Sequence, residues 1–293
     1  MNNFRDCPFC NFNLNNSLAP LYRTYFQNIL YYYVKCKKCK IVYLDPVPKH
    51  TTLVEIYSAD KYHDKCYSVD KYKLYQISFN KTLMNISKYL KKKDNFLDYG
   101  CGSGFFLKFL NQQGYNVEGV EFDEDACKSA RNNSGSNIQT VKNFLNSKKT
   151  YDFIYLGDVF EHLGNPKNDM MCLLSKLNPE GYICIDGPVE RNPSLTNFIV
   201  LFNSFLKNKF KNTSLITQPP YHLSFFSKNS IYNFLLKFKE LEFVESHTYE
   251  TGWPLLGSNF LKNVLGSVSI FISKLPFFTK DYGNRNRIVF RKR

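Results

Sequence analysis

A glycine-rich turn between an expected strand and an expected helix is the strongest constraint on the fold of this sequence. The apolar run over residues 95–99 is followed by glycines at alternate positions, Gly100, Gly102 and Gly104. A stretch with helical character, residues 105–113, comes directly after. Glycine has no Cβ, so it adopts the dihedral angles of a tight turn and leaves room for a ligand. This order of elements lets a nucleotide-like ligand approach the backbone at the start of the helix.

The spacing of the glycines distinguishes this turn from the dinucleotide fingerprint. That fingerprint reads G-x-G-x-x-G/A, and here Phe105 occupies the position of its last glycine or alanine. The turn instead reads D-x-G-C-G-S-G from Asp98. A second expected strand, residues 116–121, ends in Glu121. An acidic residue at the tip of that strand can bind both ribose hydroxyls of a nucleotide, and Phe122 beside it can flank an adenine ring.

Strands and helices alternate along the middle of the chain, and this rhythm predicts a parallel α/β sheet. The expected strands are residues 95–99, 116–121, 138–141, 151–156, 182–186, 242–251 and 287–291. The expected helices between them are residues 105–113, 124–132, 167–177 and 230–237. Phe144 follows the third strand, where the edge of an adenine ring would lie.

Four cysteines near the N-terminus form two C-x-x-C pairs, Cys7 with Cys10 and Cys36 with Cys39. Two such pairs can present four thiolates tetrahedrally to one Zn²⁺ ion. We therefore predict a zinc-ribbon-like module over residues 1–48. Its role would be structural, because the protein fills all four ligand positions and leaves none open for water or substrate. A redox dithiol is the competing interpretation of a single C-x-x-C pair.

Several sequence strings together resemble the class I S-adenosylmethionine-dependent methyltransferases. They are the glycine turn, Glu121 at the end of strand two, the string Y-D-x-I-x-x-x-D-V-x-E-H-L-x-x-P from Tyr151, and L-x-P-x-G-Y-I-x-I from Leu177. The resemblance covers roughly residues 7–250. Within the superfamily the strings resemble small-molecule and glycan methyltransferases that carry an N-terminal two-knuckle zinc ribbon.

The resemblance implies a Rossmann-like, seven-stranded, mostly parallel sheet with helices on both faces, whose last strand pairs antiparallel. It also implies S-adenosyl-L-methionine as the cofactor. The cofactor-binding residues expected on this basis are Asp98, Gly100, Gly102, Gly104, Glu121, Phe122, Phe144 and Asp158.

The chain is predicted to have three parts. The zinc-ribbon-like module is followed by a linker with N-terminal helices over residues 49–93. The methyltransferase domain then takes residues 94–293, with insertions at about 190–220 and 252–281. In the first insertion, residues 195–209 carry aromatic and aliphatic side chains on nearly every side, so we expect a helix packed over the site.

Two histidines fall where the acceptor chemistry is expected, His162 after the fourth strand and His222 after the first insertion. Transfer to a hydroxyl benefits from a base, and an imidazole pKa near neutrality suits that task. Glu161 completes the candidate catalytic set. Two alternatives stay open. His162 can hold its loop by a structural hydrogen bond, and the three side chains can hold a divalent metal.

The predicted function is methyl transfer to a hydroxyl of a sugar, a glycan or another small polar acceptor, which the resemblance places in surface polysaccharide biosynthesis. The net charge of +14 favours acidic partners, such as a phosphorylated acceptor, nucleic acid or an anionic membrane face. Nucleic acid is disfavoured, because residues 157–160 read G-D-V-F instead of the Asp/Asn-Pro-Pro-aromatic loop typical of base amino-methylation. The alternatives are an RNA or other nucleic-acid methyltransferase and an inactive cofactor-binding module.

The nine cysteines form no disulfide pattern, and residues 1–10 lack the apolar segment of a signal peptide. A reducing, cytoplasmic environment is therefore expected. The most apolar late stretch, residues 264–278, is interrupted by Lys274 and Pro276 and is too short to span a bilayer. We expect no transmembrane segment and at most peripheral contact with a membrane.

Overall fold

The computed structural model of this chain describes residues 4–13, 20–57, 72–211, 215–216, 219–257, 259–277 and 281–293. Of the linker expected over residues 49–93, residues 58–71 lie outside these ranges. The described part of that linker contains α1 (His50–Tyr57) and α3 (Tyr72–Ile86).

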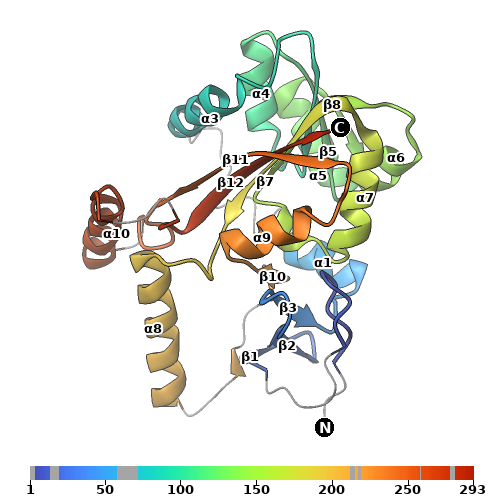
Figure 1. Cartoon of the computed structure of the whole chain (residues 1–293). Helices are drawn as coiled ribbons and strands as arrows, with labels where there is room; N and C mark the ends of the chain where they lie inside the picture. The colour runs from blue at the N-terminus through green and yellow to red at the C-terminus, as the bar shows by residue number, and fades with distance from the viewer. Residues whose placement is uncertain are drawn as a thin grey trace.

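The larger part of the protein is built on a seven-stranded sheet with the strand order β11-β12-β8-β7-β4-β5-β6. Its strands are β4 (Asn95–Tyr99), β5 (Asn116–Glu121), β6 (Asn137–Thr140), β7 (Tyr151–Gly157), β8 (Leu177–Pro188), β11 (Leu241–Tyr249) and β12 (Arg285–Lys292). Neighbouring strands from β6 to β8 pair parallel, whereas β12 pairs antiparallel with both β8 and β11. The predicted Rossmann-like, mostly parallel sheet is confirmed, with its antiparallel last strand (Figure 1).

Helices cover both faces of this sheet. They are α4 (Phe105–Gln112), α5 (Glu124–Ser134), α6 (Val141–Asn146), α7 (Pro166–Lys176) and α9 (Lys228–Leu235). On one face, Leu107 of α4 and Ala130 of α5 share an apolar core with Phe96 of β4. On the other face, Met170 of α7 shares a core with Leu97, the next residue of β4. Successive side chains of β4 point to opposite faces of the sheet, so they contribute to two separate apolar cores.

The connections of β4 define where a ligand can enter. The chain leaves β4 through α4 and returns in β5 on one side, while β7 lies on the other side of β4. In open α/β sheets, ligands bind at the carboxyl ends of the strands where the order reverses in this way. That point lies between β4 and β7.

A second, five-stranded sheet contains the N-terminal segment, in the order β10-β3-β2-β1-β9. Its strands are β1 (Tyr22–Phe26), β2 (Ile29–Lys35), β3 (Val42–Asp45), β9 (Leu215–Ile216) and β10 (Ser224–Phe225). The two short strands β9 and β10 come from the other half of the chain and lie on opposite edges of the hairpin formed by the first three. The division at residue 48 stays a prediction, since this sheet draws on both sides of it.

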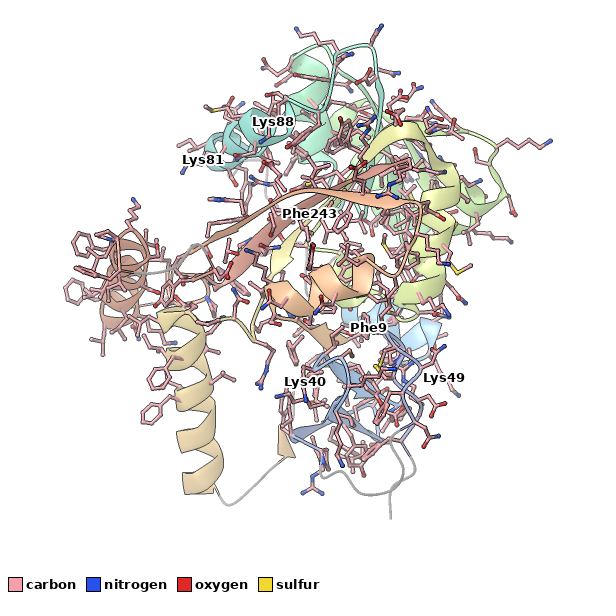
Figure 2. The ribbon with its side chains drawn as sticks, in the orientation of Figure 1. Phe9, Lys40, Lys49, Lys81, Lys88 and Phe243 are labelled. Carbon is pink, nitrogen blue, oxygen red and sulfur yellow. The ribbon has the colours of Figure 1, made fainter. Side chains whose placement is uncertain are left out.

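Aromatic contacts join the N-terminal segment to the larger sheet's helices. Phe9 lies where this segment meets α9 (Figure 2), in edge contact with Phe226 and with Phe234 of α9. Lys237 donates a hydrogen bond to the backbone oxygen of Phe9 at 2.8 Å. The two parts of the molecule therefore share one continuous apolar core.

The expected helix of the first insertion forms, but it does not pack over the site. Helix α8 (Leu195–Lys211) stands beside α10 (Phe260–Ser273), and Figure 1 shows both projecting away from α1 and the central strands. Phe198 remains 64% exposed and lies stacked on Phe202, another largely exposed ring. An apolar surface all around a helix can be left exposed as well as buried, and the sequence does not say which.

Candidate active site

The glycine turn has the left-handed backbone angles that a tight glycine turn predicts. The φ angles of Gly100, Gly102 and Gly104 are +81°, +54° and +77°, in the region that L side chains rarely adopt. A Cβ atom on Gly100 would lie 2.4 Å from a methyl carbon of Val159, in the loop after β7. The glycines therefore let the turn approach that loop more closely than any other residue would.

Glu121 fastens the turn to the end of β5. One carboxylate oxygen accepts a hydrogen bond from the Gly102 N–H at 2.7 Å, and the other accepts from the Phe122 N–H at 2.8 Å. A carboxylate has about four acceptor positions, so two such bonds leave capacity for ligand hydroxyls. The position of Glu121 thus fits the ribose role expected from the sequence.

A cavity of about 300 Å³ opens at the carboxyl ends of β4, β5 and β7. Its volume is at the lower end of the range for small-molecule sites. Of the residues predicted for the site, those that line the cavity are Gly100, Gly102, Glu121, Phe122, Asp158 and His162. Five other predicted residues are not among the lining residues: Asp98, Gly104, Phe144, Glu161 and His222.

Phe144 is placed differently from the prediction. It lies on α6 and is 1% exposed, packed against Tyr99 and Tyr151. The residue of α6 that lines the cavity is Val141. The segment after β6 becomes a helix, in which Val141 and Phe144 lie on one face. Val141 at the start of the helix borders the cavity, whereas Phe144, one turn further along, packs into the core.

Asp98 lies beneath the turn as a buried carboxyl group, 5% exposed, in the strand next to Glu121. Burial, together with the negative charge of Glu121, raises its pKa to about 8. A cationic ligand close to Glu121 would favour the ionised form of Asp98. The donor set therefore fits S-adenosylmethionine, whose sulfonium and ammonium groups are positive.

Helix α1 (His50–Tyr57) forms one wall of the cavity, which the sequence did not indicate. Leu53 and Tyr57 line the cavity, and His50 stacks on Phe122 with the ring centroids 4.7 Å apart. The short helix was expected, but nothing in its sequence shows which distant strands it covers.

The loop after β7 is held by an ionic network that runs from the exposed Asp158 to the buried Asp186. Asp158 has a φ of +56°, unusual for a residue with a side chain, and forms an ion pair with Arg285 at 2.7 Å. Arg285 also lies near Asp186, which Arg287 binds through two nitrogens, each at 2.8 Å. Strained non-glycine backbone of this kind is concentrated at functional sites. These arginines of β12 were missed from the sequence, because their partners lie just after β7 and on β8, far along the chain.

Glu161, His162 and His222 come together although sixty residues separate the two histidines. One potential ligand atom from each lies within 4.8 Å of the others. The two imidazole rings have centroids 5.0 Å apart and are nearly perpendicular, at 85°. Of the three, only His162 lines the cavity.

Each of these residues is held by a partner of its own. His162 Nδ1 lies 2.7 Å from the Tyr221 carbonyl oxygen, and His222 Nδ1 lies 2.7 Å from a carboxylate oxygen of Glu190. Burial lowers the pKa of His162 and raises the pKa of Glu161. Burial alone would lower the pKa of His222, but the hydrogen bond to Glu190 raises it. Glu190 was also missed from the sequence.

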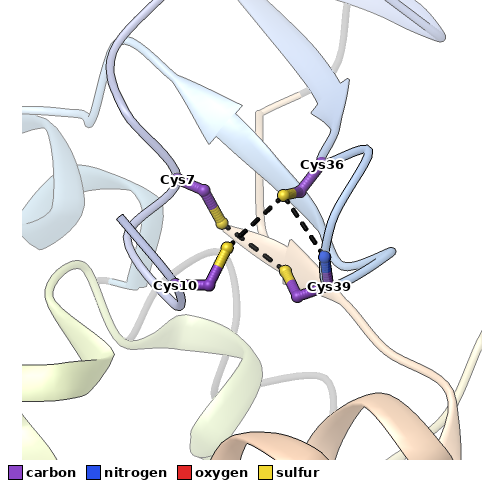
Figure 3. A group of neighbouring side chains, drawn as sticks. All are labelled: Cys7, Cys10, Cys36 and Cys39. Atoms are coloured by element: carbon purple, nitrogen blue, oxygen red, sulfur yellow. Dashed lines mark hydrogen bonds between the residues drawn. The ribbon is translucent and has the colours of Figure 1, made fainter. Parts of the chain in front are cut away.

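The four N-terminal cysteines converge as expected (Figure 3). The Sγ atoms of Cys7 and Cys39 are 3.6 Å apart, as are those of Cys10 and Cys36. A tetrahedron of sulfurs around zinc has edges of about 3.8 Å, given Zn–S bonds of about 2.3 Å. The donor set and its spacing therefore fit one zinc ion.

The sequence of this chain also matches a known protein family. The pattern of a family described as "Methyltransferase domain" matches residues 71–238, more than half of the chain. The chain belongs to this methyltransferase family. The expected enzyme class, an S-adenosylmethionine-dependent methyltransferase, is thereby confirmed.

Curated relatives of this methyltransferase share part of its length. It is 25% identical over 185 residues to a ubiquinone biosynthesis O-methyltransferase of Rickettsia akari, in a match covering 60% of this chain and 71% of the relative. It is 26% identical over 144 residues to a ribosomal protein L11 methyltransferase of Campylobacter concisus, covering 47% of each. The chain thus spans about half the length of that second relative.

Solved structures of similar fold include a SAM-dependent methyltransferase from Archaeoglobus fulgidus. That match has 22% identity and a TM-score of 0.48, and covers 75% of this methyltransferase and 99% of the other chain. The plantazolicin methyltransferase BpumL, solved with a monoazolic substrate analogue and SAH, matches at 18% identity with a TM-score of 0.48 and covers 83% and 95% of the two chains. Within the described residues of this methyltransferase, helices are too short or too polar to cross a membrane.

Proposed function

We propose that this methyltransferase methylates a hydroxyl of a sugar, a glycan or another small polar acceptor, and acts in surface polysaccharide biosynthesis. The observation that carries the proposal is the cavity, which His162 lines together with Gly102 and Glu121, the residues proposed for the cofactor. A site of about 300 Å³ under α1 suits a small molecule or the end of a glycan better than duplex nucleic acid. The Rickettsia relative is named an O-methyltransferase, which supports an oxygen acceptor.

The cofactor would occupy the part of the cavity between β4 and β5. S-adenosyl-L-methionine supplies an electrophilic methyl group bound to a sulfonium. In this proposal the turn residues Gly100, Gly102 and Gly104 leave it room, Glu121 accepts from its ribose hydroxyls, and Phe122 packs beside its adenine. Asp98 supplies a negative charge beneath the turn, and Asp158 completes the wall after β7. Phe144 is not proposed again, because it belongs to the core.

The acceptor would occupy the part of the cavity near His162. Positioning the hydroxyl in line with the methyl group supplies a large share of the rate. The hydroxyl proton has to leave as the new carbon–oxygen bond forms. We assign the handling of this proton to the cluster of Glu161, His162 and His222, of which His162 reaches the cavity.

We also propose that Cys7, Cys10, Cys36 and Cys39 bind one structural Zn²⁺ ion. Four protein ligands would leave no open position, so this zinc would support the fold and take no part in the reaction. We further propose a cytoplasmic location, with a phosphorylated acceptor or a membrane-bound glycan within reach of the positively charged surface. Peripheral contact with a membrane stays a prediction.

A transfer assay tests the acceptor. Radiolabelled S-adenosylmethionine is incubated with nucleotide sugars, lipid-linked glycans, RNA and ribosomal protein, and the methylated product is identified. We expect label on a sugar hydroxyl, no label with Gly102→Val, and about 10²-fold slower turnover with His162→Asn at unchanged cofactor affinity. Label found only on RNA or protein would refute the proposed acceptor class. Cofactor binding without transfer to any substrate would favour the inactive module.

A further inference from the structure

We propose that Glu161, His162 and His222 bind one divalent transition-metal cation at the acceptor side of the cavity. Two imidazole nitrogens and one carboxylate oxygen can be offered by these residues from positions within 4.8 Å of one another. Sites that combine imidazole nitrogen with carboxylate oxygen bind first-row divalent metals. Glu161 is 2% exposed, so its charge is shielded from water and would benefit from a cation.

The hydrogen bonding of His162 leaves its Nε2 atom available to bind a cation. Its Nδ1 lies 2.7 Å from the Tyr221 carbonyl oxygen, and a carbonyl can only accept, so Nδ1 carries the proton. The unprotonated Nε2 then faces Glu161, whose carboxylate oxygen is 3.8 Å away. Metal-binding histidines have this arrangement, with one nitrogen donating to an outer oxygen and the other on the ion.

His222 repeats the arrangement with a carboxylate. Its Nδ1 lies 2.7 Å from one oxygen of Glu190, which leaves Nε2 available to a cation. The second oxygen of Glu190 is buried and has no hydrogen-bond partner in the part of the chain that the structure describes. A buried carboxylate oxygen without a hydrogen-bond partner is costly unless a positive centre nearby balances its charge. A cation on His222 would provide that centre.

Three protein ligands leave coordination positions open, and His162 places them at the cavity. An acceptor hydroxyl bound there would have its pKa lowered, so that its proton passes to solvent water more readily. The oxygen lone pair then forms the bond to the methyl carbon as the carbon–sulfur bond breaks. This role rests on the proposed function, whereas the binding of the cation does not.

The two candidate metal sites differ in donor chemistry, which allows them to be measured separately. Thiolates select soft ions and zinc, whereas Mn²⁺ is suited to hard donors such as the carboxylate of Glu161. Mn²⁺ is therefore a selective probe for Glu161, His162 and His222 in the full-length protein. Zinc content, followed by mass spectrometry, shows that the cysteine site is unchanged during the titration.

The test is a Mn²⁺ titration of chelator-treated protein, followed by electron paramagnetic resonance without acceptor or cofactor. We expect about one bound equivalent and at least tenfold weaker binding in Glu161→Gln and His222→Asn. The matched control is His247→Asn, which removes an exposed histidine of β11 and should bind as wild type does. Circular dichroism and thermal melting show whether each variant is folded.

A spectroscopic measurement on the unaltered protein keeps the test independent of any variant. Electron spin-echo modulation of the bound Mn²⁺ should show nitrogen nuclei from two imidazoles. Binding at fewer than about 0.2 equivalents, modulation without nitrogen, or equal affinity in folded variants would overturn the proposal. A protein that binds Mn²⁺ in this way but methylates only RNA would instead refute the proposed acceptor while keeping the metal site.

Discussion

Two carboxyl groups at the ends of adjacent strands give the cofactor region its charge. Asp98 is buried in β4, and Glu121 at the end of β5 is held by the N–H groups of Gly102 and Phe122. Of the groups around Asp98, only the negative charge of Glu121 adds to burial in raising its pKa, to about 8, while the Cys101 thiol stays neutral because burial and Asp98 raise its pKa. Below that pH the free protein therefore keeps Asp98 protonated.

We predict that cofactor affinity rises with pH up to about 8. A cation bound beside Glu121 favours ionised Asp98, so binding releases a proton whenever Asp98 is protonated beforehand. Affinity should then increase by up to about tenfold per pH unit below the pKa of Asp98 and level off above it. Calorimetry in buffers of different ionisation enthalpy measures both the affinity and the released proton.

The stability of the free protein should change in the opposite direction. The folded pKa of Asp98 lies above its ordinary value, so its contribution to stability is complete below about pH 4. That contribution is lost progressively as the pH rises toward 8. Asp98→Asn should remove both pH dependences. Unchanged proton release in this variant would show that another group is responsible.

At the scale of elements, the local sequence pattern predicts individual strands but does not predict which distant segments come into contact. The bounds of β4 and β5 agree with the sequence, because apolar runs end at a glycine turn and at an acid. The four cysteines were identified by spacing alone. What could not be predicted is contact between segments far apart: α1 over the cavity, and Arg285 bound to Asp158. The two-residue strand β10 has no periodicity to detect at all.

Errors of the sequence analysis have the same cause. Helix α6, which was not expected, and the expected helix α8 both carry side chains whose direction depends on neighbours absent from the local pattern. Phe144 faces the core because α6 presents that side to the sheet, whereas Phe198 stays exposed although α8 packs beside α10. An aromatic residue indicates that its ring tends to be buried, but the fold determines which element, if any, the ring packs against.

A prediction for helix α1 distinguishes the role of the Tyr57 ring from the role of the Tyr57 hydroxyl. Tyr57 lines the cavity, donates to the Tyr221 carbonyl oxygen at 2.7 Å, and lies 2.9 Å from His162 Nδ1. Tyr57→Phe keeps the wall but loosens the support of His162. We expect turnover to fall by roughly threefold to tenfold, the worth of one hydrogen bond, with cofactor affinity within about twofold.

Tyr57→Ala provides the comparison, because it removes the wall as well. Cofactor affinity and turnover should both fall, as measured by calorimetry and by transfer to the identified acceptor. If Tyr57→Phe and Tyr57→Ala lower cofactor affinity equally, the hydroxyl contributes to cofactor binding and the division described above is wrong.

At the scale of the whole molecule, the N-terminal sheet holds the segment that carries His222. Strand β10 pairs with β3 two residues after this histidine, the Leu44 N–H donates to the Leu223 carbonyl at 2.9 Å, and the Tyr33 hydroxyl donates to the His222 carbonyl at 2.8 Å. Cys36 and Cys39 lie in the connection between β2 and β3, the two strands that present these groups, and Cys7 and Cys10 precede β1. Zinc bound there would stabilise the acceptor side from a distance.

We therefore predict that the double substitution Cys7→Ser and Cys10→Ser removes zinc and impairs the acceptor side selectively. Melting temperature should fall, and hydrogen exchange should accelerate in residues 221–227, because β3 no longer holds them. Residues 96–104 rest on the larger sheet, so their exchange and the cofactor affinity should change little, while turnover falls more than tenfold. Cys172→Ser, at a half-buried cysteine of α7 outside both pairs, is the matched control. A zinc-free double variant with wild-type exchange in residues 221–227 would show that the ribbon and the acceptor side are independent.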